Sequence, residues 1–241
     1  MSFRFKQFTI DDSRCAMKVG TDAVILGVWA DCGEDNTETR ILDVGTGSGV
    51  IALMLAQRNT AARIEGIDID EDAVAQARDN FAASPWHERL TVKKISLQEY
   101  CKAENGIYEG AYDIIVSNPP YFHNSLKAPD AKRSIARHTD TLQLTDLTSC
   151  SARMLKENGI LAVIIPQQQE EELIMSAERN GMQLQRILRV QGRAERPVKR
   201  VVVILRKTTQ RQEAREDTLV LEEGVNERTQ AYKDLTQDFY L

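Results

Sequence analysis

The tetrad Asn118-Pro119-Pro120-Tyr121 is the part of the sequence best suited to chemistry at an amino group. A planar amide or aryl amine is a poor nucleophile because its lone pair is delocalised. The Asn118 side-chain oxygen and the Pro119 carbonyl oxygen can each accept one amino hydrogen, which favours a tetrahedral nitrogen with a localised pair. Such bonds strengthen as positive charge develops and contribute about 1.5–3 kcal/mol each. The tetrad therefore predicts attack by an amino nitrogen without a histidine base.

The residues around Asn118 are expected to make this loop rigid and aromatic. Pro119 and Pro120 fix their own φ and restrict the residue before each of them. Tyr121 offers a flat face to a base that is turned out of its stack, and Phe122 is the next candidate for contact with the acceptor. The alternative is a rigid surface turn, because Asn-Pro and Pro-Pro are ordinary loop signals.

A glycine-rich loop follows the first predicted strand, at 40–44. It begins at Asp43 and places glycine at Gly45, Gly47 and Gly49. Glycine lets the backbone approach a ligand closely, and ligands of open α/β sheets bind beyond the carboxyl ends of the strands. The dinucleotide fingerprint G-x-G-x-x-G is not matched, because Val50 stands at its third glycine position. The loop predicts a nucleoside cofactor site, and the alternative is a tight βα turn.

A carboxylate ends the second predicted strand, at 63–68. Asp68 lies nineteen residues after Gly49, where an acid can accept both hydroxyls of a ribose. An acid at this place also occurs in enzymes that use NAD. Asp68 therefore indicates a ribose and does not by itself identify a reaction.

Strands and helices alternate along most of the chain. Strands are predicted at 40–44, 63–68, 90–95, 112–117 and 159–165, with helices from 50, at 71–82 and at 144–155. Repeated βα units imply a mainly parallel sheet covered on both faces. Segments 183–190 and 200–205 predict an antiparallel hairpin at the sheet edge, followed by a short strand at 218–223 and a closing helix at 227–241.

Length and composition predict one domain without a metal or a membrane segment. The chain has 241 residues and 42% hydrophobic content, enough for one well-filled core. We expect a cap at 1–36, a core at 37–207 and an extension at 208–241 that packs on the core. The apolar runs are too short to span a bilayer, and three histidines and four scattered cysteines suit neither a metal site nor a disulfide framework. We expect a cytoplasmic protein that is a monomer.

Together, the glycine loop and the tetrad resemble motifs I and IV of the class I S-adenosylmethionine-dependent amino-methyltransferases, which act on adenine, cytosine or glutamine. The resemblance implies a Rossmann-like, doubly wound α/β fold with a seven-stranded, mostly parallel sheet. It also implies S-adenosylmethionine as the cofactor, held by the glycine loop, Asp43 and Asp68. In this family an acid after the third strand often meets the cofactor adenine; here Ser96 stands at that place.

The N-terminal run from Phe5 to Gly27 and the aromatic tail resemble one branch of these enzymes. That branch is a bacterial family which methylates the adenosine at position 37 of a valine tRNA. The resemblance implies that Lys18, Thr21 and Asp22 lie over the methionine end of the cofactor. From the residues alone, Thr21 or Asp22 is equally suited to cap the N-terminus of an apolar helix.

Local positive charge fits an RNA partner, although the net charge of −5 does not. Between Arg186 and Lys207 the chain has eight basic residues and one acid. The residues assigned to RNA phosphates are Lys132, Arg133 and Arg137 after the tetrad, and Arg193, Arg196, Lys199 and Arg200 in the predicted hairpin. The alternative for each group is a solvated face.

Three other functions compete with tRNA methylation. A protein-glutamine methyltransferase uses the same tetrad but gains little from basic flanks. A DNA adenine methyltransferase usually carries an added target-recognition region, for which this chain has little spare length. A non-catalytic RNA-binding module on the same fold is disfavoured by intact Asn118 and Asp68.

Overall fold

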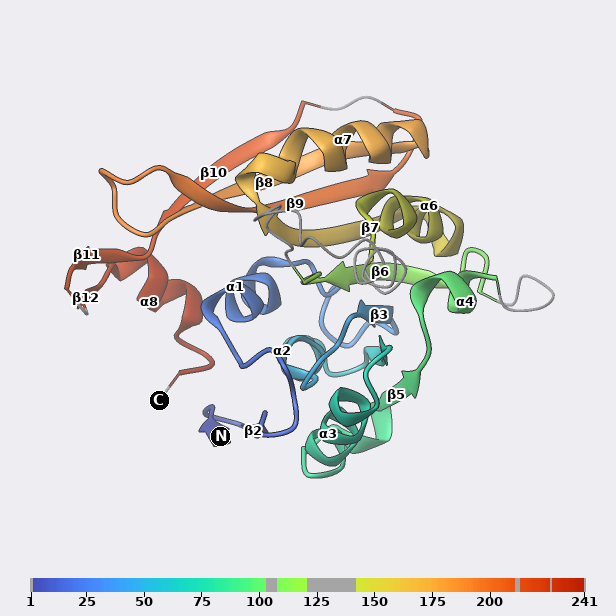
Figure 1. Cartoon of the computed structure of the whole chain (residues 1–241), viewed down its shortest axis with the longest axis horizontal. Helices are drawn as coiled ribbons and strands as arrows, with labels where there is room; N and C mark the ends of the chain where they lie inside the picture. The colour runs from blue at the N-terminus through green and yellow to red at the C-terminus, as the bar shows by residue number, and fades with distance from the viewer. Residues whose placement is uncertain (1, 103–107, 121–141, 211–212, 226, 241) are drawn as a thin grey trace, which may run out of the picture.

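The computed structural model describes residues 2–102, 108–120, 142–210, 213–225 and 227–240. In these residues the centre of the molecule is an eight-stranded sheet with the order β10-β8-β9-β7-β6-β3-β4-β5 (Figure 1). In that order the strands span Arg215–Val220, Met182–Gln191, Val198–Lys207, Leu155–Pro166, Tyr112–Ser117, Arg40–Val44, Arg63–Asp68 and Leu90–Lys94. Strands β3 to β7 are parallel to one another, whereas β9 is antiparallel to both β7 and β8. The predicted Rossmann-like, mostly parallel α/β fold is confirmed.

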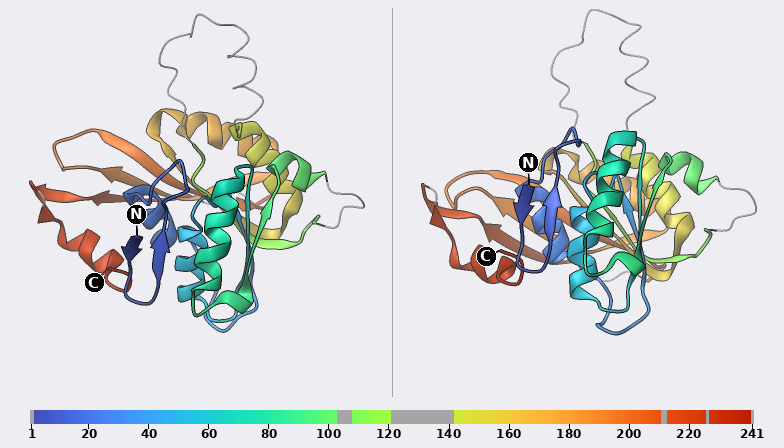
Figure 2. Two further views of the ribbon diagram at one scale, coloured as in Figure 1. Left: turned by 60° about the horizontal axis from the view of Figure 1, so that its bottom comes forward. Right: turned by 90° about the horizontal axis from the view of Figure 1, so that it is seen from below.

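Helices cover both faces of this sheet, as Figures 1 and 2 show. Along β7, successive side chains point to opposite faces, so Ile160 and Ile164 belong to one hydrophobic core and Leu161 and Ile165 to the other. The first core is completed by α1, α2 and α3, which span Thr21–Trp29, Val50–Arg58 and Glu71–Ala82. The second is completed by α4, α6 and α7, which span Leu97–Cys101, Leu144–Met154 and Glu170–Arg179.

One prediction about the sheet edge was wrong. The β8–β9 hairpin forms as expected, but β10 pairs with β8 in parallel and lies outside it, so the hairpin is not at the edge. Strand β10 is an eighth strand beyond the seven that were expected. Its first four residues are exposed and charged or polar, and backbone pairing with β8 makes this segment a strand.

The C-terminal segment also differs from the prediction, because its helix is shorter than 227–241. Two short strands, β11 at Glu222–Gly224 and β12 at Glu227–Arg228, precede α8 at Gln230–Thr236. The helix begins after Thr229 because the Thr229 hydroxyl accepts a hydrogen bond from the backbone N–H of Tyr232 at 3.1 Å. The tail nevertheless packs on the molecule, since Phe239 is buried in the first core.

The two ends of the chain lie side by side (Figure 1). The N-terminal strands β1 and β2, at Ser2–Arg4 and Thr9–Asp11, form an antiparallel pair, and the backbone N–H of Lys6 between them donates to the carbonyl of Phe239 at 2.8 Å. The N-terminal segment then crosses towards α3 and the carboxyl ends of the parallel strands. None of the helices in the described ranges has the length and apolar character needed to cross a bilayer.

Candidate active site

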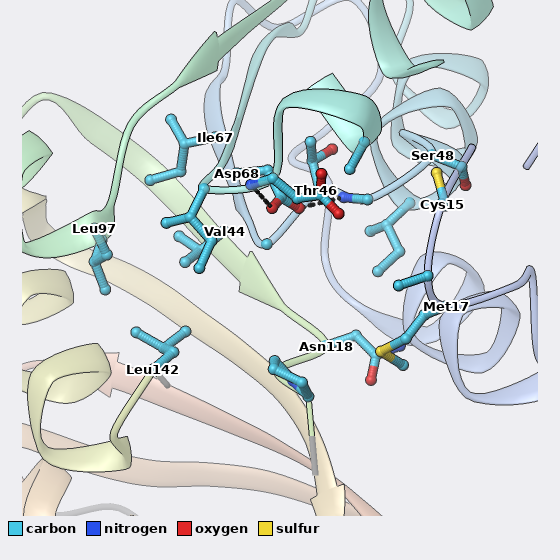
Figure 3. A pocket seen from close by; sticks show the side chains of 18 of the residues that line it. Cys15, Met17, Val44, Thr46, Ser48, Ile67, Asp68, Leu97, Asn118 and Leu142 are labelled. Atoms are coloured by element: carbon cyan, nitrogen blue, oxygen red, sulfur yellow. Dashed lines mark hydrogen bonds between the residues drawn. The ribbon is translucent and has the colours of Figure 1, made fainter. Parts of the chain in front are cut away.

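A cavity of about 510 Å³ lies beyond the carboxyl ends of β3, β4, β5 and β6 (Figure 3). This volume is within the usual range of small-molecule sites. Its wall combines the glycine loop, Asp68, the 95–99 segment, Asn118 and the N-terminal segment 15–19. The parallel order of the strands explains this meeting, because parallel strands bring their carboxyl ends to one edge of the sheet.

The glycine loop is built to leave space on the cavity side and to fit tightly on the other. Gly47 has a φ of 56°, and a Cβ added there would meet nothing within 4 Å. Gly49 has a φ of 83°, and a Cβ there would be 2.4 Å from the Phe81 ring of α3. Gly47 therefore lets a ligand approach the backbone, whereas Gly49 lets α3 pack against the loop. Gly45 also lines the cavity.

The Asp68 carboxylate is held at the cavity wall by backbone groups. One of its oxygens accepts from the N–H of Gly47 at 2.9 Å, and the other accepts from the N–H of Asp70 at 3.0 Å. Each carboxylate oxygen has a second lone pair, so both can still accept a ligand hydroxyl. The first of these bonds also ties the end of β4 to the glycine loop.

Asp43 lies behind the glycine loop and not in the cavity wall. Its carboxylate is fully buried and accepts a hydrogen bond from the Thr46 hydroxyl at 2.7 Å. Burial raises the pKa of the Asp43 carboxyl to about 7, and the nearby Asp68 carboxylate adds to this rise. The structure thus places Asp43 where it braces the loop from inside the protein.

Ser96 lies in the wall but its hydroxyl is already engaged. Ser96 caps α4: its Oγ accepts from the N–H of Glu99 at 3.2 Å and donates to the Glu99 carboxylate at 2.7 Å. Contact between Ser96 and a cofactor adenine stays a prediction. The neighbouring Leu97 and Ile95 add apolar surface to the same part of the wall.

Of the three N-terminal residues assigned to the cofactor, the structure brings only Lys18 to the cavity wall. The Lys18 ammonium group donates to the carbonyls of Asp12 at 2.7 Å and Cys15 at 3.0 Å, so it closes its own loop. Thr21 and Asp22 lie in the first turn of α1, outside the wall.

The alternative helix-cap role of Thr21 or Asp22 was wrong. Gly20 occupies the N-cap position of α1 and no side chain caps the helix. The helix begins at Thr21, so both residues lie within its first turn and not at the cap position, and the Asp22 carboxylate accepts from the Arg200 guanidinium of β9 at 2.9 Å. Arg200, assigned to RNA from the sequence, is thus engaged within the protein.

Asn118 reaches the cavity from the end of β6. The preceding residue, Ser117, is fully buried, and Asn118 is half-buried with its side chain at the cavity (Figure 3). Pro120 also lines the cavity, whereas Pro119 is buried. The remaining tetrad and acceptor predictions, Tyr121 and Phe122, lie outside the described residues.

Two large apolar side chains at the cavity were missed in the sequence. Met17 is 51% exposed and Ile69 is 53% exposed, although both are apolar. Ile69 could have been found because it directly follows Asp68 on a loop. Met17 has no such signal, since its place depends on how the N-terminal segment folds over the cavity.

The β8–β9 loop lies at the same end of the strands as Asn118. Ser117 is level with Val163 of β7, Pro166 at the end of β7 is level with Arg200, and Gln191 is level with Val198. The loop 192–197 joins β8 to β9 at this end of the strands and carries Arg193 and Arg196. Lys199 follows it as the second residue of β9. Arg196 and Lys199 are exposed. Lys132, Arg133 and Arg137, the other predicted RNA contacts, lie outside the described residues.

No group of histidine, cysteine and acidic side chains suited to hold a metal ion occurs in the part of the chain that the structure describes. The four cysteines, Cys15, Cys32, Cys101 and Cys150, are free thiols.

The chain is similar to known methyltransferases in sequence and in fold. The family model described as "Methyltransferase small domain" matches residues 28–186. A tRNA1(Val) (adenine(37)-N6)-methyltransferase from Parabacteroides distasonis is 46% identical over 99% of this chain and 97% of its own length, and one from Phocaeicola vulgatus is 44% identical over the same shares. In fold, the chain is similar to a predicted O-methyltransferase, Atu636, from Agrobacterium tumefaciens, with a TM-score of 0.65 and 22% identity over 90% of this chain and 96% of that one.

Proposed function

We propose that this chain, which belongs to the family of tRNA1(Val) (adenine(37)-N6)-methyltransferases, transfers a methyl group from S-adenosylmethionine to N6 of adenosine 37 in a valine tRNA. One observation carries the proposal. Asn118, which directly follows β6, and Asp68, which ends β4, lie on either side of β3 and line a single cavity together with the glycine loop. An amide that can activate an amino group and an acid that can hold a ribose thus meet at one place.

The cavity fits a nucleoside with a charged amino-acid tail. The open space beside Gly45 and Gly47 lies next to the Asp68 carboxylate, so a ribose can reach Asp68 while a tail follows the loop. The apolar side chains Ile67, Ile69 and Leu97 offer flat contacts to an adenine ring. When bound, S-adenosylmethionine supplies an electrophilic methyl group on a sulfonium.

Asn118 and Pro119 are proposed to activate the acceptor. The Asn118 side-chain oxygen and the Pro119 carbonyl each accept one hydrogen of the adenine N6 amino group, which localises the nitrogen lone pair. Both bonds strengthen as N6 becomes positively charged, so they stabilise the transition state more than the ground state. The nitrogen becomes strongly acidic once it carries this charge, and it releases its extra proton to water.

The basic loop 192–197 is proposed to bind tRNA phosphates. Arg193 and Arg196 in this loop, and Lys199 after it, lie at the same end of the strands as Asn118, which follows β6. A stem whose anticodon loop enters the cavity would thus pass a positively charged surface. These contacts set position and affinity and do not read the base. We also propose that the enzyme acts on its tRNA substrate in the cytoplasm, and that it acts as a monomer that binds one tRNA.

The test is nucleoside mass spectrometry of bulk tRNA from cells with and without this gene. We expect loss of N6-methyladenosine from one valine tRNA, and its return with the wild-type gene but not with Asn118→Ala. Unchanged tRNA nucleosides would contradict the proposal. Loss of a methylated glutamine from a release factor would favour the protein-glutamine alternative.

A further inference from the structure

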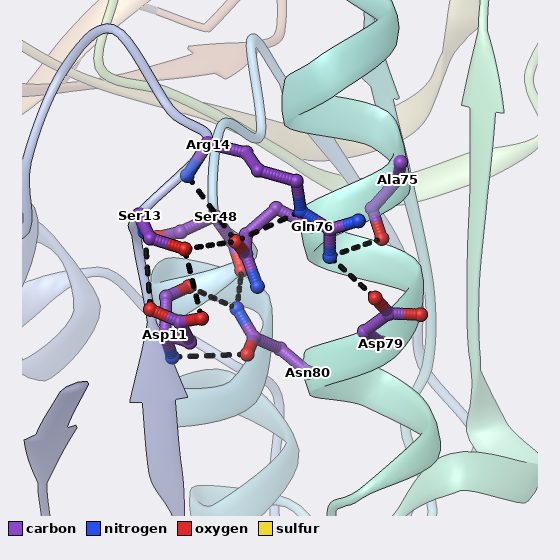
Figure 4. Close-up of polar contacts among 8 residues, drawn as sticks. All are labelled: Asp11, Ser13, Arg14, Ser48, Ala75, Gln76, Asp79 and Asn80. Carbon is purple, nitrogen blue, oxygen red and sulfur yellow. Dashed lines mark hydrogen bonds and ion pairs between the residues drawn. The ribbon is translucent and has the colours of Figure 1, made fainter. Parts of the chain in front are cut away.

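A buried asparagine on α3 connects the N-terminal segment to the glycine loop, and both segments contribute to the cavity wall. Asn80 is only 5% exposed. Its side-chain nitrogen donates to the carbonyl of Asp11 at 2.7 Å and to the carbonyl of Ser48 at 2.8 Å, and its oxygen accepts from the N–H of Asp11 at 3.0 Å (Figure 4). One amide therefore bonds the N-terminal segment and the glycine loop at the same time.

Gln76, one helical turn before Asn80, holds the next part of the N-terminal segment. It is 2% exposed, and its side-chain oxygen accepts from the Arg14 Nε at 3.1 Å and from the Ser13 hydroxyl at 3.3 Å (Figure 4). The Arg14 guanidinium also pairs with Asp79 of the same helix. Residues 11–14 are thus fixed along α3, directly before residues 15–19 that line the cavity.

The N-terminal segment keeps its own shape through separate bonds. The Asp12 carboxylate accepts from the N–H of Val19 at 3.0 Å, and Lys18 donates to carbonyls at the start of the same loop. Segment 12–19 is therefore a closed loop whose placement relative to Gly45–Gly49 depends on how it is attached to α3. Asn80 is the attachment that also reaches the glycine loop.

We propose that Asn80 is a positioning residue for cofactor binding, which holds segment 12–19 and the glycine loop at the separation that a bound ligand needs. The role requires an amide. A carboxylate in its place could accept from the N–H of Asp11, but its second oxygen would lie against the carbonyl oxygens of Asp11 and Ser48 and could not donate to them. An apolar side chain would leave both carbonyls without this donor. The inference rests on the proposed function for the identity of the ligand, S-adenosylmethionine or its product.

The test compares Asn80→Asp with Asn59→Asp in the full-length protein. Asn59 is also buried, and its side-chain nitrogen donates to the carbonyl of Cys32 at 2.8 Å, but it lies after α2, away from the cavity wall. Calorimetry measures binding of S-adenosylhomocysteine, and thermal unfolding measures stability. We expect the dissociation constant to rise about tenfold or more in Asn80→Asp; a tenfold rise corresponds to a loss of about 1.4 kcal/mol of binding free energy. In Asn59→Asp the dissociation constant should stay within about twofold of wild type.

A split between binding and turnover distinguishes positioning from a general loss of structure. At saturating S-adenosylmethionine, Asn80→Asp should keep its kcat within about threefold of wild type, because bound cofactor restores the arrangement. Gln76→Met, which removes only the bonds to Ser13 and Arg14, should also raise the dissociation constant for S-adenosylhomocysteine. This variant replaces Asn80→Asp as the test if Asn80→Asp does not fold. Equal affinity in the wild type and in the folded variants of Asn80 and Gln76, with lowered thermal stability, would overturn the inference. Failure of the wild type to bind S-adenosylhomocysteine would instead overturn the proposed function, and this inference with it.

Discussion

The Ser117 hydroxyl donates a hydrogen bond to the carbonyl oxygen of Val44 at 2.9 Å, inside the protein. These two residues are level with each other at the ends of the neighbouring strands β6 and β3. Asn118 directly follows the first, and Gly45 directly follows the second. This bond therefore fixes the loop that would bind the acceptor relative to the loop that would bind the cofactor.

Ser117→Ala should impair turnover as well as stability. Loss of one buried hydrogen bond should lower the free energy of unfolding by about 1 kcal/mol in a denaturant titration. A small displacement of Asn118 should lower kcat by about tenfold. The matched control is Ser151→Ala, because Ser151 is equally buried and its hydroxyl has no hydrogen-bond partner among the described residues. If the two variants have the same kcat, the Ser117 bond does not position Asn118.

Asp68→Ala should act on cofactor binding and not on the chemical step. Two charge-assisted bonds to ribose hydroxyls, at about 1.5–3 kcal/mol each, predict a rise of about a hundredfold or more in the dissociation constant for S-adenosylmethionine. Calorimetry or equilibrium dialysis measures this change. Asp72→Ala, an exposed acid in the first turn of α3, is the control and should bind normally. Unchanged affinity in Asp68→Ala would mean that another group holds the ribose.

Asp43 should make stability depend on pH near neutrality. Because burial raises the pKa of its carboxyl from 3.8 to about 7, the folded protein holds a proton in this range that the unfolded chain has lost. The stability that comes from this proton is fully present below pH 3.8 and is lost as the pH rises through about 7.

Asp43→Asn removes this titration and should therefore change the pH profile. Urea denaturation at each pH measures the free energy of unfolding of both proteins. The value for Asp43→Asn minus the value for the wild type should increase by about 1–3 kcal/mol from pH 5 to pH 8, because the wild type loses stability over this range. A constant difference between the two proteins across this range would show that Asp43 does not titrate there.

Arg193→Glu and Lys199→Glu should weaken tRNA binding while leaving turnover at saturation unchanged. Each change should raise KM for tRNA and reduce the dependence of binding on salt, as expected for the loss of a phosphate contact. The control is Arg179→Glu. Arg179 is an exposed residue in the last turn of α7, three residues before β8 begins at the opposite end of the strands. An equal KM for tRNA in all three variants would show that the β8–β9 loop is a solvated surface and does not bind tRNA.

The sequence was sufficient for elements that local patterns determine. The strand at 40–44, the helix at 71–82 and the loop between Gly45 and Gly49 have strong local signals, and the structure has them at these places. A short strand was predicted at 218–223, but its start at Arg215 and its parallel pairing with β8 could not be predicted, because the polar residues 215–218 become a strand only through that pairing.

Contacts between distant residues limited the prediction of the site. The ion pair of Asp22 and Arg200 joins residues 178 positions apart, so no spacing in the sequence points to it. Gln76 and Asn80 had a weak signal that was missed: they are polar residues four positions apart, on the face of α3 that also carries the apolar Ala73 and Ala77. A buried polar pair on an apolar helix face predicts a structural partner for each side chain.

The most direct test of the account is methyl transfer by Asn118→Ala to a valine tRNA transcript, measured with labelled S-adenosylmethionine at saturation. The account predicts a fall in kcat of about 10²–10³, together with a dissociation constant for S-adenosylhomocysteine within about twofold of wild type, because the lost bonds form to the acceptor. A wild-type rate in this variant would contradict the account.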